Sequence, residues 1–135
     1  MFLQPKKTKH KKIKKGKLRK LEFKATKIVF GNVGLKSVNS GIISARNIEA
    51  ARRAISRKIK KKGKIWVRVF PDLPVSSKPT SSRMGKGKGS NSHWSARVYG
   101  GTVLFEICGI KDPQIVESAL KTGSAKLPLK TRIFK

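Results

Sequence analysis

Hydrophobic positions between residues 44 and 62 recur with the period of an α-helix. At about 100° per residue, the apolar side chains gather on one side of a helical wheel and the basic side chains on the other. The two groups are Ile48, Ala51, Ile55 and Ile59 on the apolar side, and Arg46, Arg53, Arg57 and Lys60 on the basic side. Ser44 is suited to cap the first turn, and Gly63 follows the last periodic residues. The pattern predicts an amphipathic helix over residues 44–62.

Shorter apolar segments, rich in β-branched and aromatic residues, predict strands before and after this helix. Residues 28–30 and 35–38 are expected to form two short strands that meet at a glycine-containing turn. A third strand is expected over residues 64–70. The remaining strands are a predicted β-hairpin of residues 94–99 and 102–107 around Gly100-Gly101, and a closing strand over residues 127–134.

A second, shorter helix is predicted over residues 113–122. Its apolar face consists of Ile115, Val116, Ala119 and Leu120. Helices and strands therefore interleave, while the expected hairpins favour antiparallel pairing. We predict one α+β domain over residues 28–135, with an antiparallel or mixed sheet and two packed helices.

Residues 1–27 do not fit either pattern. They hold twelve lysines and arginines but one acid, Glu22, and such dense like charge favours an extended arm that orders on an anionic surface. A tail that only improves solubility is the alternative, and a mitochondrial presequence is rejected because the segment has lysine pairs, Pro5 and almost no serine. The lysines expected to contact that surface are Lys6, Lys7, Lys9, Lys11, Lys12, Lys14 and Lys15.

A long loop rich in glycine and lysine is predicted over residues 76–93, inside the domain. Its centre reads Arg83, Met84, Gly85, Lys86, Gly87, Lys88 and Gly89. The spacing fits neither the dinucleotide-binding motif nor the P-loop. Alternating glycines nevertheless let the backbone approach a phosphate closely, while the lysines supply charge. We expect the loop to contact nucleic acid; the alternative is a flexible surface linker.

The charge of the whole chain points to a polyanionic partner. Thirty-four basic residues face six acids among 135 residues, which gives a net charge of +28. Nucleic acid is the first candidate and an anionic membrane the second. The apolar runs span a few residues, far fewer than the roughly 20 that cross a bilayer, so membrane insertion is not expected. No homo-oligomer is expected either.

The basic side of the 44–62 helix is the third candidate surface for nucleic acid. A solvated helix surface usually mixes charges of both signs, but here Glu49 is the one acid available to pair with the cations. A phosphate backbone is therefore the predicted partner of this side, and a merely solvated surface is the alternative. Its residues are Arg46, Arg52, Arg53, Arg57 and Lys60.

The residue inventory does not favour catalysis, a metal or a cofactor. The six acids are scattered singly, and the two histidines, His10 and His93, lie far from each other and from Cys108. Cys108 is expected to be a small buried residue, and a single cysteine excludes an internal disulfide. Trp66 and Trp94 either stack on bases or pack in the core, and core packing is expected for at least one of them.

Several motifs together resemble one family, the bacterial-type large-subunit ribosomal protein L sixteen, from end to end. They are Leu3-Gln4-Pro5-Lys6, Phe30-Gly31 with Gly34-Leu35-Lys36, Ile48 to Ala54, Gly63 to Asp72, Arg83 to Gly89, and Ala125-Lys126-Leu127-Pro128. The resemblance implies an α+β protein without catalytic activity, bound to large-subunit ribosomal RNA (rRNA) and to neighbouring ribosomal proteins. It further implies a place near the aminoacyl-tRNA (A) site, where the protein helps to position tRNA.

The resemblance also suggests a compartment. Met1 matches the start of the family, so no import sequence is expected, and 25 lysines against nine arginines indicate an AT-rich genome. Residues 94–98 and 104–106 look closer to mitochondrial and α-proteobacterial members than to plastid ones. A mitochondrial ribosome is predicted, with the bacterial cytoplasm as the alternative. The rival classes are a histone-like nucleic-acid binder, a membrane-active cationic protein and an RNA-modifying enzyme.

Overall fold

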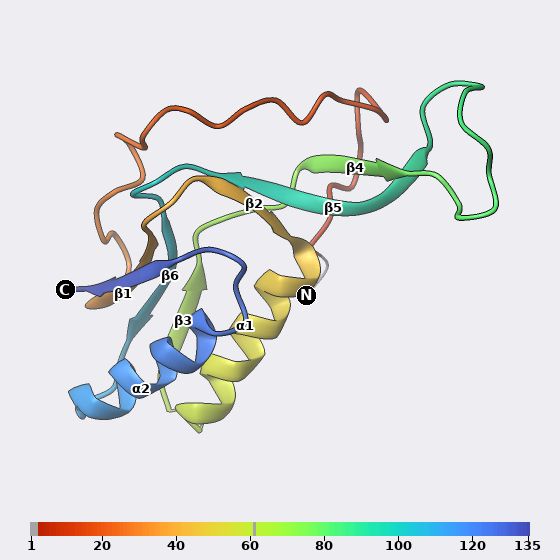
Figure 1. The fold of residues 1–135 in the computed structure, drawn as a ribbon. Coiled ribbons are helices and arrows are strands. Elements are labelled where there is room, and N and C mark those ends of the chain that lie inside the picture. The colour runs from red at the N-terminus through yellow and green to blue at the C-terminus, as the bar shows by residue number, and fades with distance from the viewer. Residues whose placement is uncertain (1–2, 61) are drawn as a thin grey trace.

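The computed structural model describes residues 3–60 and 62–135 and confirms an α+β fold (Figure 1). Its elements, in chain order, are β1 (Val33–Ser37), β2 (Gly41–Ser44), α1 (Ala45–Lys58), β3 (Lys64–Val67), β4 (Leu73–Ser77), β5 (Ser90–Val98), β6 (Val103–Cys108), α2 (Pro113–Ser124) and β7 (Thr131–Phe134). Strands β3-β6-β1-β7 form one sheet and β2-β5-β4 a second. All the strand pairs in both sheets are antiparallel.

The core lies between the two helices and the sheets, with buried residues from β1 and β6 of the four-stranded sheet and from β2 and β5 of the three-stranded sheet. Helices α1 and α2 pack against each other, and a Cβ added at Gly123 would lie 2.6 Å from Cγ1 of Ile55. Glycine at this position therefore lets the helices approach closely. The residues expected on the apolar side of α1 are buried, and those expected on its basic side are exposed, as the periodicity predicted.

Helix α1 begins where it was predicted to begin but ends earlier than predicted. Ser44 caps the helix, because its hydroxyl accepts a hydrogen bond from the amide of Asn47 at 3.2 Å. The helix ends at Lys58, four residues before the predicted end at residue 62. Lys60 adopts a left-handed conformation with φ of 51°, which ends the helical backbone before Gly63 is reached.

The predicted hairpin around Gly100-Gly101 is wrong. Strands β5 and β6 follow one another in the chain but belong to different sheets: β5 pairs with β2 and β4, whereas β6 pairs with β1 and β3. A tight turn is present, closed by the hydrogen bond from the Thr102 amide to the Tyr99 carbonyl. The turn also bonds to Ser37 through both Gly101 and Thr102, so it passes the chain between sheets.

Other strand boundaries also need correction. Residues 28–30 are not a strand, and strand β3 ends at Val67 rather than at residue 70. The closing strand begins at Thr131 rather than at residue 127. Strand β4 was not predicted, and with the early start of β5 it shortens the loop from residues 76–93 to residues 78–89.

The basic arm is extended, but it lies on the domain rather than apart from it. Figure 1 shows it running over the three-stranded sheet, from the start of α1 to the neighbourhood of β1 and β6. Leu3 is 8% exposed and belongs to the core, and Leu21 forms an isolated bridge with Gly100. The amide of Val103 donates to the carbonyl of Ala25 at 2.9 Å. In the described part of the chain, neither helix is long and apolar enough to cross a membrane.

Candidate nucleic-acid interface

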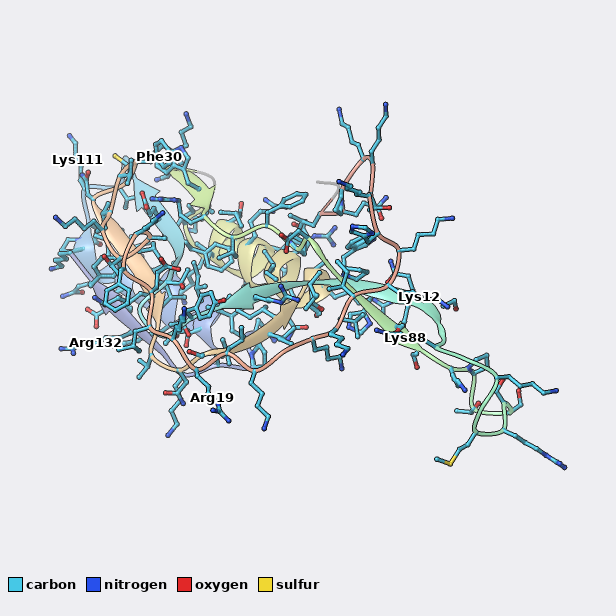
Figure 2. The ribbon with its side chains drawn as sticks, turned by 90° about the horizontal axis from the view of Figure 1, so that it is seen from above. Lys12, Arg19, Phe30, Lys88, Lys111 and Arg132 are labelled. Carbon is cyan, nitrogen blue, oxygen red and sulfur yellow. The ribbon has the colours of Figure 1, made fainter. Side chains whose placement is uncertain are left out.

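The loop of residues 78–89 projects beyond the tips of β4 and β5, away from the rest of the molecule (Figures 1 and 2). Three successive residues at its centre have left-handed backbone: Gly85, Lys86 and Gly87, with φ of 91°, 51° and 85°. Met84 is 98% exposed. A Cβ added at Gly85 or Gly87 would meet nothing within 4 Å, so glycine is required there by the backbone conformation and not by crowding.

The base of this loop is bonded to the arm. The ammonium group of Lys12 donates to the carbonyl of Lys88 at 2.6 Å, and the ammonium group of Lys88 donates to the carbonyl of Ile13 at 2.8 Å. Next along the arm, Arg97 of β5 donates to the carbonyl of Lys14 at 2.9 Å. The structure thus brings together two of the predicted sites, the arm and the glycine-rich loop. Figure 2 shows Lys12 and Lys88 side by side at the root of the loop.

The arm connects the third predicted site as well. Its first described residues, Leu3 and Gln4, line a cleft with the α1 residues Arg46, Arg53 and Arg57. The seven arm lysines predicted to bind RNA are all exposed. Cationic side chains therefore extend from the exposed side of α1, along the arm, to the loop. We call the exposed basic residues of these three segments the basic surface.

One acid modifies the α1 part of this surface. Glu49 accepts two hydrogen bonds from Arg52, at 2.7 and 2.8 Å, and one from Arg53 at 2.9 Å. Hydrogen bonds from Arg52, reinforced by Arg53, lower the pKa of Glu49 to about 2. Two of the five predicted helix cations are thus paired within the protein, whereas Arg46, Arg57 and Lys60 have no ion-pair partner among the described residues.

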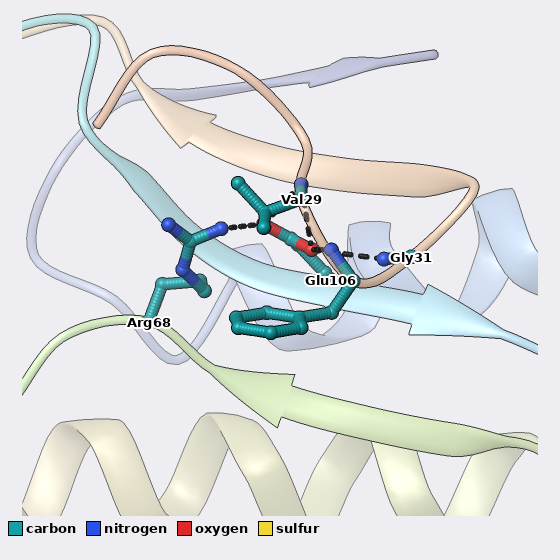
Figure 3. Close-up of polar contacts among 5 residues, drawn as sticks. Val29, Gly31, Arg68 and Glu106 are labelled. Carbon is teal, nitrogen blue, oxygen red and sulfur yellow. Dashed lines mark hydrogen bonds and ion pairs between the residues drawn. The ribbon is translucent and has the colours of Figure 1, made fainter. Parts of the chain in front are cut away.

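A buried ionic site at Glu106 was not predicted from the sequence (Figure 3). Its carboxylate is fully buried and accepts hydrogen bonds from the amides of Phe30 at 2.6 Å and Gly31 at 2.9 Å, with Val29 at 3.3 Å. The guanidinium of Arg68 completes the site. Burial alone would raise the pKa of Glu106, but these backbone and guanidinium hydrogen bonds outweigh it and lower the pKa.

This site explains why residues 28–30 do not form a strand. Three successive amides turn toward one carboxylate, an arrangement that a strand cannot provide because its amides alternate in direction. The signal available in the sequence was a lone acid, Glu106, in an otherwise apolar strand. Such a residue is rarely buried without a partner, but the sequence does not name the partner.

Most of the remaining acids also serve the fold. Glu22 accepts from the amides of Phe23, Lys24 and Ala25, Asp112 caps α2, and Glu117 pairs with Lys121 at 3.0 Å. Within residues 3–60 and 62–135, no three His, Cys, Asp or Glu side chains are grouped to hold a metal ion. Cys108 was expected to be buried, but it is partly exposed. Its thiol donates a hydrogen bond to Oδ1 of Asn32, with the sulfur 3.7 Å from that oxygen.

The family model described as ribosomal protein L16p/L10e matches residues 5–134, almost the whole chain. The chain belongs to this family. Relatives of the L16 family share about half of its residues, and they include the large ribosomal subunit proteins uL16 of three bacteria. The Bartonella henselae and Bartonella bacilliformis proteins are 51% and 52% identical over 133 residues, covering 98% of this chain and 96% of theirs. The Caulobacter vibrioides protein is 50% identical over 132 residues, covering 98% and 92%.

These matches confirm the resemblance carried by the sequence motifs. The glycine-rich loop and the arm from Pro5 onward fall inside the matched range of the L16 model. The basic surface is therefore part of the portion of the chain that the family model describes.

Proposed function

We propose that this L16-family chain is a non-catalytic structural constituent of the large ribosomal subunit. Its basic surface binds large-subunit rRNA, and the loop of residues 78–89 lies at the aminoacyl-tRNA site, where it helps to position the A-site tRNA during translation. Neighbouring large-subunit proteins are further partners, and no cofactor takes part. Relatives named as large ribosomal subunit proteins, matched over nearly their whole length, support the assignment.

The observation that carries the proposal is the connection between the loop and the arm. Lys12 of the arm donates to the loop backbone, and Lys88 of the loop donates to the arm backbone. These two hydrogen bonds fix the root of the loop, while its tip projects from the domain. If the arm binds rRNA phosphates, the hydrogen bonds between arm and loop would hold the root of the loop at a defined place in the subunit. The tip would remain free to approach a second RNA, with glycines that allow close backbone contact.

Sedimentation of a tagged copy tests the ribosomal assignment. The tagged protein should migrate with the large subunit and stay with it at salt concentrations that release nonspecifically bound basic proteins, because an assembled site adds shape complementarity and protein contacts to the salt-sensitive phosphate contacts. A histone-like protein would instead leave the particle and bind duplex DNA as strongly as rRNA. Failure to migrate with the large subunit contradicts the proposal.

Crosslinking tests the position of the loop. A photoreactive amino acid placed at Met84, which is exposed at the tip, should form a crosslink to tRNA in ribosomes with an occupied A site. The same group at Lys130, exposed between α2 and β7, is the control and should not crosslink to tRNA. Crosslinks to tRNA from both positions, or from neither, would show that the loop is not placed as proposed.

For the compartment we propose the mitochondrial matrix, with the bacterial cytoplasm as the alternative. The excess of lysine over arginine and the segments of residues 94–98 and 104–106 support this choice. Fractionation of the source cells decides the question. Recovery of the protein in ribosomes from purified mitochondria supports the matrix, and recovery in a bacterial lysate contradicts it.

A further inference from the structure

An aromatic pair flanked by cations lies at the edge strand β3 of the four-stranded sheet. The rings of Phe30 and Trp66 stack with centroids 6.1 Å apart and planes inclined by 17°. The ammonium group of Lys64 lies 5.1 Å from the Trp66 ring centroid, and the guanidinium of Arg68 lies 5.1 Å from that of Phe30. We call these four residues the aromatic platform.

The platform is partly exposed, although its two aromatic residues are of types that usually lie in a core. Phe30 is 54% exposed and its chain neighbour Val29 is 63% exposed, while Trp66 is partly buried. Large apolar side chains gain little free energy of folding when half of their surface stays in water. An exposed group of this kind commonly marks an interaction site.

The backbone holds Phe30 in place independently of its own burial. The amides of Phe30 and its two neighbours donate to the buried carboxylate of Glu106 (Figure 3). Gly31 packs so closely on β6 that an added Cβ would lie 2.8 Å from the carbonyl oxygen of Ile107. The ring is therefore presented by a fixed backbone, as a recognition site requires.

The chemistry of the platform fits an unpaired nucleotide. Every nucleobase has a π-face that can stack on an aromatic ring, and an adjacent cation can pair with the phosphate. Lys64 is exposed and supplies such a charge, and Glu106, which accepts a hydrogen bond from the Phe30 amide, is buried and already paired. Figure 2 shows Phe30 at the opposite end of the molecule from Lys88 and the loop. The platform is therefore separate from the loop.

We propose that the aromatic platform is a second rRNA contact, at which an unpaired base stacks on the exposed part of the Phe30–Trp66 pair. This inference rests on the proposed rRNA-binding function and adds a contact that depends on bases rather than on charge. A protein partner with an apolar surface is the alternative, and it appears below as an outcome.

The test compares two probes that carry the same phosphates: a short oligoadenylate and an abasic ribose-phosphate chain of equal length. The full-length protein should bind the oligoadenylate more tightly than the abasic chain. Phe30→Leu should reduce that preference about tenfold, the typical loss for one stacked base, while binding to the abasic chain stays the same. Phe30→Tyr, which keeps the ring, should retain the preference.

A matched control and a folding check complete the experiment. Phe23→Leu removes another exposed phenyl ring, 82% exposed and outside the platform, and should leave the preference unchanged. Urea unfolding establishes that each variant is folded before binding is measured. In a variant in which Trp94→Phe leaves Trp66 as the one tryptophan, oligoadenylate but not the abasic chain should quench the fluorescence.

The outcomes separate this inference from the proposed function. An unchanged base preference in Phe30→Leu overturns the platform as a base-stacking site, whereas salt-dependent binding to both probes still supports rRNA binding. If wild-type protein binds both probes equally and Phe30→Leu instead loses a neighbouring ribosomal protein from the particle, the platform is a protein contact. Failure of the wild-type protein to bind either probe contradicts both proposals.

Discussion

Gly87 and Gly89 stand close together in the loop, but a Cβ would meet different surroundings at each. At Gly87 it would meet nothing within 4 Å, although φ is 85°; at Gly89 it would lie 2.4 Å from the carbonyl oxygen of Ser77. Gly87→Val should therefore change the shape of the loop tip, which lies outside the core and can relax to another backbone conformation. Gly89→Ala should disturb the root of the loop, where β4 ends at Ser77.

The expected result is a separation of function from stability. Gly87→Val should weaken A-site tRNA binding by assembled ribosomes and shift the melting temperature of the free protein by less than about 2 °C. Gly89→Ala should lower the stability by about 1–3 kcal/mol. Lys86→Ala should affect tRNA binding less than Gly87→Val, because neighbouring cations partly replace one charge. A severe Lys86→Ala defect beside a silent Gly87→Val would show that charge, not close approach, matters.

Glu106 predicts an acid-sensitive fold. Its pKa is lower in the folded protein than the ordinary value of 4.5, so its contribution to stability is present above that value and is lost as the pH falls through the folded pKa. Glu106→Gln should cost about 3 kcal/mol at neutral pH, because it leaves Arg68 without its partner. Urea unfolding at several pH values measures both effects.

The control for Glu106→Gln is Asp72→Asn. Asp72 is exposed, so its change should alter the free energy of unfolding by no more than about 0.5 kcal/mol. Between pH 4.5 and more acidic values, Glu106→Gln should lose less stability than the wild type. If Glu106→Gln and the wild type lose equal stability as the pH falls, Glu106 is not the group responsible for acid sensitivity.

The cations of helix α1 take part in internal ion pairs, which would compete with the RNA binding proposed for them. Glu49 lies between Arg52 and Arg53, whose guanidinium groups would otherwise be available to phosphates. Glu49→Gln should cost about 1 kcal/mol of stability, a small value because Arg53 is largely exposed and water screens the pair. The same change should tighten rRNA binding and make its dependence on salt steeper by about one unit of log–log slope.

The matched control for this change is Glu117→Gln on α2. Glu117 also pairs with a cation one helical turn away, Lys121, but α2 is outside the basic surface. Its substitution should leave the salt dependence of rRNA binding unchanged. If both substitutions steepen the slope equally, the effect comes from net charge rather than from release of Arg52 and Arg53.

Elements that depend on the pattern of their own residues were predicted from the sequence. Strand pairings and contacts that depend on residues far away in the chain were not. The period of α1 follows from its own residues, so its buried and exposed sides were correct. Strands β5 and β6 were paired in the prediction because Gly100-Gly101 marks a turn, yet a turn does not fix which strands pair. The loop and the arm stand out by composition and remain candidate sites, whereas the buried site at Glu106 depends on amides more than 70 residues away in the chain.

At the scale of the whole molecule, the composition gives the net charge, and the fold determines where the charged side chains lie. The arm is bonded to the loop root at Lys12 and packs its Leu3 into the core, so its backbone follows a defined path over the domain. Because Leu3 is part of the core, deletion of the arm would confuse folding with binding. Substitutions of exposed lysines that keep the arm backbone are the cleaner test.

Two triple variants with equal charge can show whether this surface binds the RNA. Lys9, Lys11 and Lys15 in the arm, or Lys121, Lys130 and Lys135 in the C-terminal part, are changed to glutamine; all six are exposed. Each variant loses three positive charges, so the net charge falls from +28 to +25 in both. A purely nonspecific attraction would respond to the two variants alike.

We expect them to differ in the salt dependence of rRNA binding. With about ten phosphates contacted, the wild-type log–log slope should be roughly −7 to −9, since each contact contributes about −0.7 to −0.9. The arm variant should lose about 2–3 units of this slope, and the C-terminal variant should match the wild type. A wild-type slope near −2 would mean that most of the basic surface faces water. Equal losses in the two variants would show that total charge, and not the arranged surface, determines binding.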